Sequence, residues 1–372
     1  MNKIEDDIRI IHIDLGNEWR GGQQQVVYLY EGMLKRGFDT ILVCQPGSAL
    51  EKYCIDKQLP YRTIKFAGEL DFRAGRLLSK ISQQYGADIL QLHCGHSVSM
   101  GLWAKMFNPK LKLVATRRVD FSIRKNLFSS LKYTNKLLNK IVCISDKIKK
   151  VLLNDGISKG KLEIIHSGID TKRFNYIRRN PNFRKVWDIP VEAVIVGTVA
   201  AFVGHKDYPN FIKTAEIVCR QRQDVYFMAV GEGELLKPMQ AKVIELGIQN
   251  RIVFTGFQND VGTFLKEFDI FVLASKLEGL GTSILDAMSL GLPVVATRAG
   301  GIPEMIDNEV NGILVPIEDA NALAESICRL ANDVVLRCRL GENALIKVKE
   351  FDIDKTIDQY ITLYAQLSDE EI

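Results

Sequence analysis

Short apolar runs alternate with amphipathic helical patterns along almost the whole chain, and this alternation constrains the fold more than any other feature of the sequence. Runs such as Ile270–Ala274 carry no polar side chain, which is typical of strands buried on both faces of a parallel sheet. Repeated strand–helix units predict an α/β protein. A chain of 372 residues exceeds one ordinary core, so we expect two domains.

The alternation is interrupted at residues 176–185, where arginine, asparagine and proline indicate a linker. We therefore expect two doubly wound, Rossmann-like domains, at residues 1–178 and 186–354, with a ligand cleft where the carboxyl edges of their sheets face each other. Strands are expected near 8–15, 40–44, 61–66, 88–93, 111–117, 140–145 and 162–166, and then near 193–197, 225–230, 251–255, 270–275, 293–297 and 312–315. The expected helices include 22–36, 72–85, 319–331, 334–349 and 354–367.

The composition, with 47% hydrophobic and 25% charged residues, is that of a soluble globular protein. No apolar stretch approaches the roughly 20 residues of a membrane span, and the first residues lack the apolar core of a signal peptide. We therefore expect a cytoplasmic protein. The seven cysteines contain no Cys-x-x-Cys pair and mostly fall in apolar patterns, which favours reduced core thiols over zinc or redox chemistry.

Positive charge is concentrated in one region, although the net charge is only +4. Residues 105–185 contain 21 Lys and Arg against five Asp and Glu. Within this region, apolar residues at near-helical spacing predict a basic helix over 123–140. It is either an ordinary surface helix with a solvated basic face or a site for an anionic membrane surface or acceptor. Nucleic acid is not an expected partner, because neither aromatic–basic interleaving nor a helix-turn-helix pattern accompanies the charge.

The most informative segment follows the apolar run that ends at Ala274. A carboxylate, Glu278, and two glycines come next, and a helix is expected to begin at Thr282 or Ser283, both good capping residues. This arrangement places free backbone N–H groups at the carboxyl edge of the sheet, where phosphate binds. Asp286 lies about one turn into the helix, and carboxylates accept hydrogen bonds from sugar hydroxyls. The segment therefore predicts a site for a sugar diphosphate.

Further glycines and one lysine are expected at the same kind of edge. Gly21-Gly22 follow the first strand and let the backbone approach a ligand, although an ordinary turn explains them equally well. Lys206 lies in the loop after the first strand of the second half, where its ammonium would neutralise a diphosphate; a plain surface lysine is the alternative. The remaining donor-side candidates are turns at the ends of later strands: Gly231, Gly233, Gly256 and Phe257.

Two of the five histidines, His93 and His96, follow a predicted strand and are expected at the mouth of the cleft, on the acceptor side. His12 lies within an apolar strand and is expected to be structural. No two histidines have the spacing of a zinc protease. Asp352 and Asp354 resemble an Asp-x-Asp metal motif, but they open the last helix, where capping is the better explanation. We infer no metal.

In combination, these motifs resemble the retaining glycosyltransferases of family 4, which have the two-domain GT-B fold, and the resemblance covers nearly the whole chain. The family pattern of a glutamate and, eight positions on, a second acid is matched by Glu278 and Asp286. Further matches are Ala287–Thr297, Gly300–Glu304, the Gly21-Gly22 turn and the interdomain signature Ile164–Asp170.

The resemblance implies a set of roles. Glu278 and the amides around Leu280, Gly281 and Thr282 would hold the donor sugar and diphosphate, and Ser283 belongs to the same turn. Asp286 would bind the ribose and Lys206 the diphosphate. The last helix, 355–372, would cross back to the first domain. The family also implies front-face attack, in which the departing phosphate takes the proton of the acceptor.

The chain departs from the family pattern in three places. The second acid is usually glutamate, and Asp286 is one methylene shorter. Ala200-Ala201 stand where an arginine usually accompanies the phosphate lysine. A histidine that often follows the fifth strand is replaced within Thr116-Arg117-Arg118, and we hypothesise that Arg118 supplies the missing positive charge from the opposite domain.

The sequence thus predicts a retaining, metal-independent glycosyltransferase without a cofactor, using a UDP- or GDP-linked sugar. The acceptor is a glycan or glycolipid hydroxyl, in cell-surface polysaccharide or lipopolysaccharide biosynthesis. The protein is expected to be cytoplasmic, either free or peripheral on the inner face of the cell membrane. Two alternatives remain open: a nucleotide-sugar-binding protein with impaired catalysis, and a nucleotide-sugar epimerase of the same architecture. A nicotinamide dehydrogenase is disfavoured, because Gly-x-Gly-x-x-Gly is missing.

Overall fold

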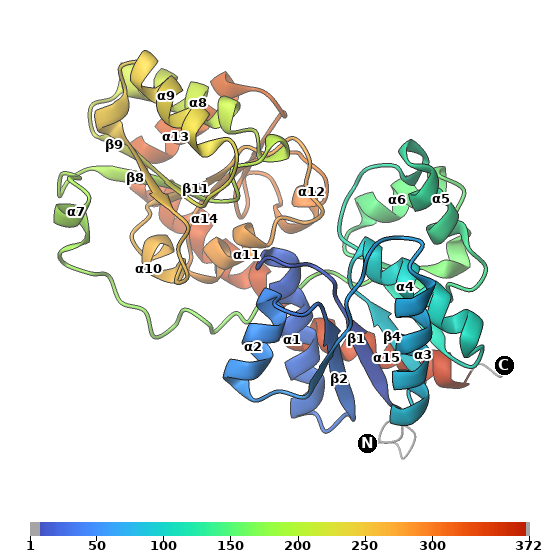
Figure 1. Ribbon diagram of the computed structural model, residues 1–372. Helices are drawn as coiled ribbons and strands as arrows, with labels where there is room; N and C mark the ends of the chain where they lie inside the picture. Colours follow the sequence, from blue (N-terminus) through green and yellow to red (C-terminus); the bar gives the residue numbers. More distant parts are fainter. Residues whose placement is uncertain (1–7, 370–372) are drawn as a thin grey trace. The chain divides into compact units, whose positions relative to one another are not determined.

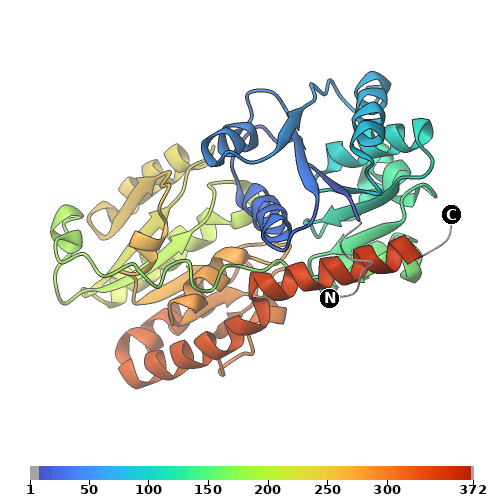
Figure 2. The same ribbon diagram turned by 90° about the horizontal axis from the view of Figure 1, so that it is seen from below.

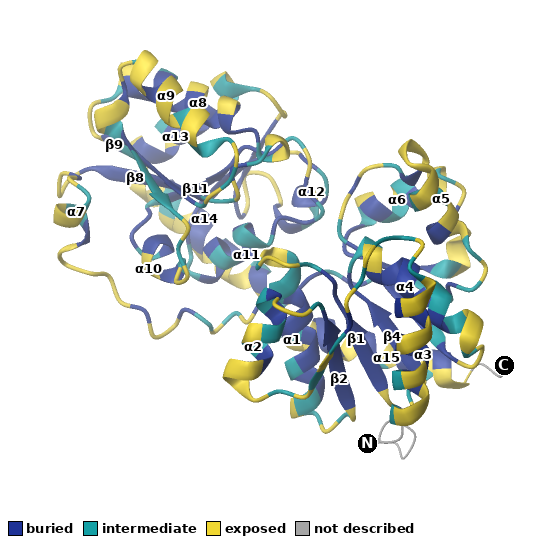
Figure 3. Ribbon diagram, viewed as in Figure 1, coloured by how far each residue is buried: buried dark blue, intermediate teal, exposed yellow. Residues whose placement is uncertain are grey.

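The computed structural model describes residues 8–369, which divide into two compact units. The first extends to Ile169 and also includes the chain from Ile353 onward; the second is Asp170–Asp352. Each unit contains one parallel sheet covered by helices (Figure 1), and the strands of both sheets are largely buried (Figure 3). The predicted α/β fold with two doubly wound sheets is confirmed.

The first unit has a seven-stranded sheet in the order β3-β2-β1-β4-β5-β6-β7. The order reverses between β1 and β4, which is the switch point of a doubly wound sheet. The strands are β1 (Ile10–Ile13), β2 (Thr40–Cys44), β3 (Tyr61–Thr63), β4 (Ile89–Leu92), β5 (Lys112–Arg117), β6 (Lys140–Cys143) and β7 (Leu162–Ile164). The helices are α1 (Gly21–Lys35), α2 (Ala49–Lys57), α3 (Phe72–Tyr85), α4 (Gly95–Phe107), α5 (Leu127–Thr134), α6 (Asp146–Asn154) and α15 (Ile353–Asp369).

The second unit has a six-stranded sheet in the order β10-β9-β8-β11-β12-β13, with its switch point between β8 and β11. The strands are β8 (Val194–Val199), β9 (Val225–Val230), β10 (Ile252–Gly256), β11 (Ile270–Leu273), β12 (Val294–Thr297) and β13 (Ile313–Val315). The helices are α7 (Phe183–Val186), α8 (Tyr208–Gln221), α9 (Leu236–Glu245), α10 (Gly262–Leu265), α11 (Thr282–Ser289), α12 (Ile302–Met305), α13 (Ala320–Asn332) and α14 (Val334–Lys347).

Local sequence signals explain most helix ends. For example, the side chain of Asp71 accepts a hydrogen bond from the amide of Ala74 at the start of α3, which ends at Gly86 in the left-handed conformation. The strands form because their apolar side chains are buried on both faces of the sheets. Short 3-10 turns, η2 (Ile123–Lys125) and η4 (Gly204–Lys206), lie in the loops after β5 and β8.

The last helix, α15, is an integral part of the first unit. Its buried residues Ile357, Tyr360 and Tyr364 share one core cluster with Leu29 and Met33 of α1. Figure 2 shows α15, in red, alongside the first unit. The C-terminal segment therefore completes the core over the N-terminal sheet.

The predicted basic helix over 123–140 is wrong. The segment contains η2, the eight-residue helix α5 and the start of β6 at Lys140. Asn126 interrupts the pattern, because its side chain caps α5 by accepting a hydrogen bond from the amide of Ser129 (3.1 Å). The faces are also inverted, since Lys132 is buried while Leu127 and Leu131 are 71% and 59% exposed.

Two other findings concern residues 8–369 as a whole. None of their helices is both long and apolar enough to cross a membrane. In the same stretch, we find no group of three or more His, Cys, Asp or Glu side chains that could hold a metal ion. The cysteines are free; four are buried as expected, whereas Cys338 is exposed.

Candidate functional site

In the second unit, two charged residues lie at the switch point of the sheet. Lys206 closes η4 in the loop after β8, and Glu278 lies in the loop after β11. Because β8 and β11 are neighbours at the point where the strand order reverses, their carboxyl ends flank the crevice in which doubly wound sheets bind ligands.

Lys206 and Glu278 form an ion pair between Nζ and Oε1. Glu278 is only 7% exposed, and its Oε1 also accepts a hydrogen bond from the hydroxyl of Ser275 (2.8 Å). The carbonyl of Ser275 in turn accepts one from Thr297 of β12 (2.6 Å). The carboxylate is therefore held by the charge of Lys206 and by one hydrogen bond from Ser275, which is itself tied to the neighbouring strand β12. Ser275 was not among the predicted residues.

The start of α11 differs from the prediction in its capping residue. Thr282 begins the helix, but the cap is Gly281 in the left-handed conformation (φ 93°), and no side chain caps this end of the described helix. The expected capping role of Thr282 or Ser283 is therefore wrong. Leu280 is buried and anchors the turn. Without a side-chain acceptor, the first-turn amides stay available to an anion.

Asp286 lies on the first turns of α11, as expected from its spacing. Burial raises the pKa of Asp286 to about 6, and the positive charge of Arg173 partly opposes this shift. A carboxyl group with this pKa changes its charge within the physiological range. Its affinity for hydroxyl donors therefore depends on pH.

The glycine turns at this edge divide into two kinds. At Gly231 and Gly233, a Cβ atom would lie 2.0 and 2.5 Å from backbone oxygens of the segment after β8, so these glycines are required by packing. Gly256 has a positive φ of 71°, but a Cβ there would meet no atom within 4 Å. The neighbouring Phe257 is 54% exposed. Of these turns, the one at Gly256 and Phe257 has an open backbone and an exposed aromatic ring that a ligand can contact.

The switch point of the first unit, between β1 and β4, carries the other predicted residues. Gly21 and Gly22 form the first turn of α1, after β1. His93 follows β4 directly and is buried (3% exposed), rather than open to solvent as expected of an acceptor contact. His96 is 61% exposed at its side chain and pairs with Glu69 (3.2 Å).

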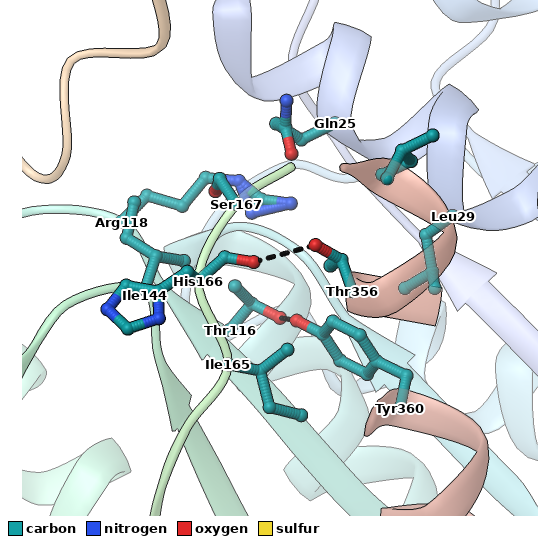
Figure 4. A pocket seen from close by; sticks show the side chains of 11 residues that line it. Gln25, Leu29, Thr116, Arg118, Ile144, Ile165, His166, Ser167, Thr356 and Tyr360 are labelled. Carbon is teal, nitrogen blue, oxygen red and sulfur yellow. Dashed lines mark hydrogen bonds between the residues drawn. The ribbon is translucent and has the colours of Figure 1, made fainter. Parts of the chain in front are cut away.

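Arg118 lies just beyond β5 and reaches this edge of the first unit. Its Cδ is 3.9 Å from the position that a Cβ on Gly22 would occupy. With Gln25 and Ser167, it lines a small pocket over α15 (Figure 4). The floor of the pocket includes a hydrogen bond between the hydroxyls of Thr116 and Tyr360 (2.9 Å). Arg118 therefore lines a pocket within the first unit that combines polar and apolar side chains.

Two doubly wound units, one with a lysine–carboxylate pair beside an uncapped helix at its switch point, have the architecture of the GT-B fold. Models of the families described as "Glycosyl transferases group 1" and "Glycosyltransferase Family 4" match residues 179–347 and 19–173. The chain belongs to these group 1, family 4 glycosyltransferases, as the sequence motifs predicted.

Individual relatives agree with this assignment, and solved structures agree with the fold. The chain is 23% identical to the Escherichia coli UDP-Gal:alpha-D-GlcNAc-diphosphoundecaprenol alpha-1,3-galactosyltransferase, with 99% of each chain covered. It is 26% identical to the lipopolysaccharide core biosynthesis glycosyltransferase LpsE of Rhizobium meliloti, covering 96% of this chain and 99% of LpsE. A glycosyltransferase from Rickettsia africae has the same fold (TM-score 0.87, 19% identity, 98% and 99% covered), as has Anabaena HepE solved with UDP-glucose (0.82, 21%, 97% and 99%).

Proposed function

We propose that this protein transfers one sugar from a nucleotide-diphosphate sugar to a hydroxyl of a glycan or glycolipid, with retention of the anomeric configuration. The observation that carries the proposal is the pairing of Lys206 with Glu278 beside the uncapped start of α11. The lysine and the amides suit a diphosphate leaving group, and the carboxylate suits the hydroxyls of the sugar.

In this proposal, each candidate residue of the second unit has a separate role in binding the donor or in catalysis. Lys206 and the amides of Gly281 and Thr282 stabilise the charge that develops on the departing diphosphate, without requiring a metal ion. Glu278 orients the donor sugar, and Asp286 accepts hydrogen bonds from the ribose. The exposed turn at Gly256 and Phe257 contacts the base.

The donor is a UDP- or GDP-linked sugar in this proposal, and no further cofactor takes part. The name of the E. coli relative specifies UDP-galactose and a lipid-linked sugar, and HepE was solved with UDP-glucose. By analogy, we infer an acceptor in the biosynthesis of a cell-surface polysaccharide or lipopolysaccharide. Thermal shifts with uridine and guanosine diphosphates would separate the two donor classes.

We also propose that the protein is cytoplasmic and acts at an anionic membrane surface. Three apolar side chains of α5, those of Leu127, Phe128 and Leu131, are exposed, and Arg124 and Lys125 stand exposed just before them. Apolar anchors next to basic residues are typical of helices that lie in a membrane interface. Flotation with vesicles containing anionic lipid should recover the protein, and replacing the three apolar residues by serine should release it; equal recovery would refute this part.

The central test of the proposed function is incubation with radiolabelled nucleotide sugars and a lipid-linked sugar acceptor, followed by determination of the new anomeric linkage. We expect a retained configuration and activity in the presence of a chelator. Tight donor binding without transfer or hydrolysis would favour the binding-protein alternative, which the shortened acid Asp286 motivates. A changed sugar without any acceptor would indicate an epimerase.

A further inference from the structure

Two buried histidines and one arginine form a hydrogen-bonded chain at the switch point of the first unit. Nη2 of Arg118 lies 3.4 Å from Nδ1 of His93, and Nε2 of His93 lies 3.0 Å from Nδ1 of His12. The two imidazole rings are stacked, with an interplanar angle of 18°. This chain links β1, β4 and the segment after β5.

The chemistry of the groups fixes the direction of every bond in this chain. A guanidinium only donates, so Nδ1 of His93 is the acceptor. In a neutral ring the proton then sits on Nε2 of His93, which donates to Nδ1 of His12. The proton of His12 is therefore on Nε2, a buried atom that has no hydrogen-bond partner among residues 8–369.

Burial keeps both rings neutral. It lowers the pKa of His12 to about 3, and burial, His12 and Arg118, in that order, lower the pKa of His93 well below its ordinary value. The guanidinium is thus the charged end of the chain. Tyr360 of α15, Asp14 and Cys94 interact electrostatically with this guanidinium and favour its charged form.

The hydrogen bond to His93 occupies only one nitrogen of the Arg118 guanidinium. Nε and Nη1 of Arg118 are buried and have no partner within the described part of the molecule. Cδ of Arg118, to which Nε is bonded, lies 3.9 Å from the position that a Cβ on Gly22 would occupy, and Gly22 is in the first turn of the 15-residue helix α1, whose N-terminal dipole also favours negative charge. A planar guanidinium with two free donors is suited to an oxyanion.

We propose that His12 and His93 are positioning residues that orient Arg118, and that Arg118 binds an oxyanion, a phosphate or carboxylate group, in the first unit. The ligand part rests on the proposed function, because the oxyanion belongs either to the diphosphate of the donor or to an acidic group of the acceptor. The positioning part stands without it.

The positioning part is tested by nitrogen-15 NMR of histidine-labelled protein, with each residue assigned by substitution. We expect His12 and His93 as neutral Nε2–H tautomers that do not titrate down to about pH 5, well below the ordinary histidine value. His12→Phe should leave His93 as the Nε2–H tautomer, because Arg118 still donates to Nδ1, whereas Arg118→Met should leave His93 as a mixture of tautomers. A proton on Nδ1 of His93, or titration of His93 near its ordinary pKa, would refute the proposed hydrogen bonds from Arg118 to His93 and from His93 to His12.

The same His93 signals report on the oxyanion. UDP and glucose 1-phosphate serve as separate probes, in a Lys206→Ala background that weakens binding at the second unit. A shift with UDP alone identifies the donor diphosphate as the source, and a shift with glucose 1-phosphate identifies an acceptor-type phosphate. No shift with either probe, or an undiminished shift in Arg118→Gln, would refute the site.

Binding of the active probe gives an independent readout. Arg118→Gln should weaken it about 10- to 100-fold, as expected for charge-assisted hydrogen bonds, and His12→Phe by a smaller factor. Ser82→Ala is the matched control, because it removes a buried hydrogen bond to the carbonyl of Leu78 within α3 and touches none of the three residues. Loss of glycosyl transfer with an intact tautomer pattern would contradict the proposed function and leave the positioning role standing.

Discussion

Lys206 carries three N–H donors, and its contact with Glu278 uses one of them. The ammonium can therefore keep its carboxylate partner and still bind a phosphate oxygen. In the same pair, the second oxygen of Glu278 remains for a sugar hydroxyl. At the scale of single residues, the ion pair is thus compatible with a bound donor and need not open to admit it.

Lys206→Ala should lower kcat by about 10²- to 10³-fold, the usual effect of removing one charge-stabilising group from an active site. The variant should remain folded, because Glu278 keeps its bond from Ser275. Steady-state kinetics with a saturating acceptor measure the effect. The control is Lys242→Ala, which removes an exposed lysine of α9 that pairs with Glu245. Wild-type turnover in Lys206→Ala would contradict the assigned role.

Asp286 should make nucleotide binding depend on pH. With a pKa of about 6, the carboxylate falls from mostly ionised at pH 7 to mostly neutral at pH 5, so the affinity for UDP should fall by up to about tenfold. Isothermal titration at both pH values measures this change. Asp286→Asn should bind UDP more weakly than the wild type at pH 7 and should lose this decrease in affinity between pH 7 and pH 5. If the variant kept the same decrease as the wild type, Asp286 would not be the ribose contact.

The raised pKa of Asp286 affects stability in the opposite direction: low pH weakens nucleotide binding but favours the folded protein. Because the pKa of Asp286 is raised, the folded protein holds this proton more tightly than the unfolded chain. The contribution is present below about pH 4 and is lost as the pH rises through about 6. The free energy of unfolding of Asp286→Asn should therefore exceed that of the wild type at pH 7 and not at pH 4, as measured by urea denaturation.

At the scale of elements, α5 shows how a polar contact overrides a sequence pattern. Lys132 is buried because its ammonium bonds to Glu69 (3.1 Å) and to the carbonyl of Gly95 (2.9 Å). This partnership between α5, α4 and the loop before α3 turns the apolar residues of α5 outward. Helical periodicity alone cannot identify such a partner, because Glu69 lies 63 positions away.

Lys132→Met should lower the free energy of unfolding of the first unit by about 2 kcal/mol, because Glu69 loses the cation that compensates the partial burial of its carboxylate. Chemical denaturation measures this loss. The exposed neighbour Lys136→Met is the control and should have little effect. If Lys132→Met were as stable as the wild type, the inverted orientation of α5 would need another cause.

The start of α15 packs so closely against residue 168 that only glycine fits at this position. At Gly168, a Cβ would lie 2.5 Å from Oγ1 of Thr356 and 2.8 Å from the Cα of Ile353. Gly168→Ala should therefore displace the start of α15 and destabilise the first unit by about 1–3 kcal/mol. Gly160→Ala, where a Cβ meets nothing within 4 Å, is the control. Equal melting temperatures for the two variants would contradict this packing.

The sequence predicted most elements, because apolar strands and capped helices are encoded by neighbouring residues. The limits of β2, β9 and α3 agree with those expected. The placement of candidate site residues was predictable where a motif is continuous, as from Glu278 to Asp286 around the start of α11. It was not predictable where contacts join distant residues: His12 and His93 are 81 positions apart, and their pairing appears only when β1 and β4 are adjacent.

At the scale of the whole molecule, the division of the chain separates the two sets of site residues. Residues 170–352 form a continuous segment with its own core, and this segment contains Lys206, Glu278 and Asp286. A fragment of these residues should fold cooperatively and bind UDP without catalysing transfer. Circular dichroism and calorimetry test this; an unfolded fragment, or a folded one that does not bind UDP, would contradict the assignment of the donor to this unit.

The central claim is that a nucleoside diphosphate binds between Lys206 and the start of α11. A crystal structure of the protein with UDP or GDP tests it most directly. We predict diphosphate oxygens about 3 Å from Nζ of Lys206 and from the amides at 281–283, with the ribose at Asp286. A nucleotide bound elsewhere, with this turn free of phosphate, would contradict the account.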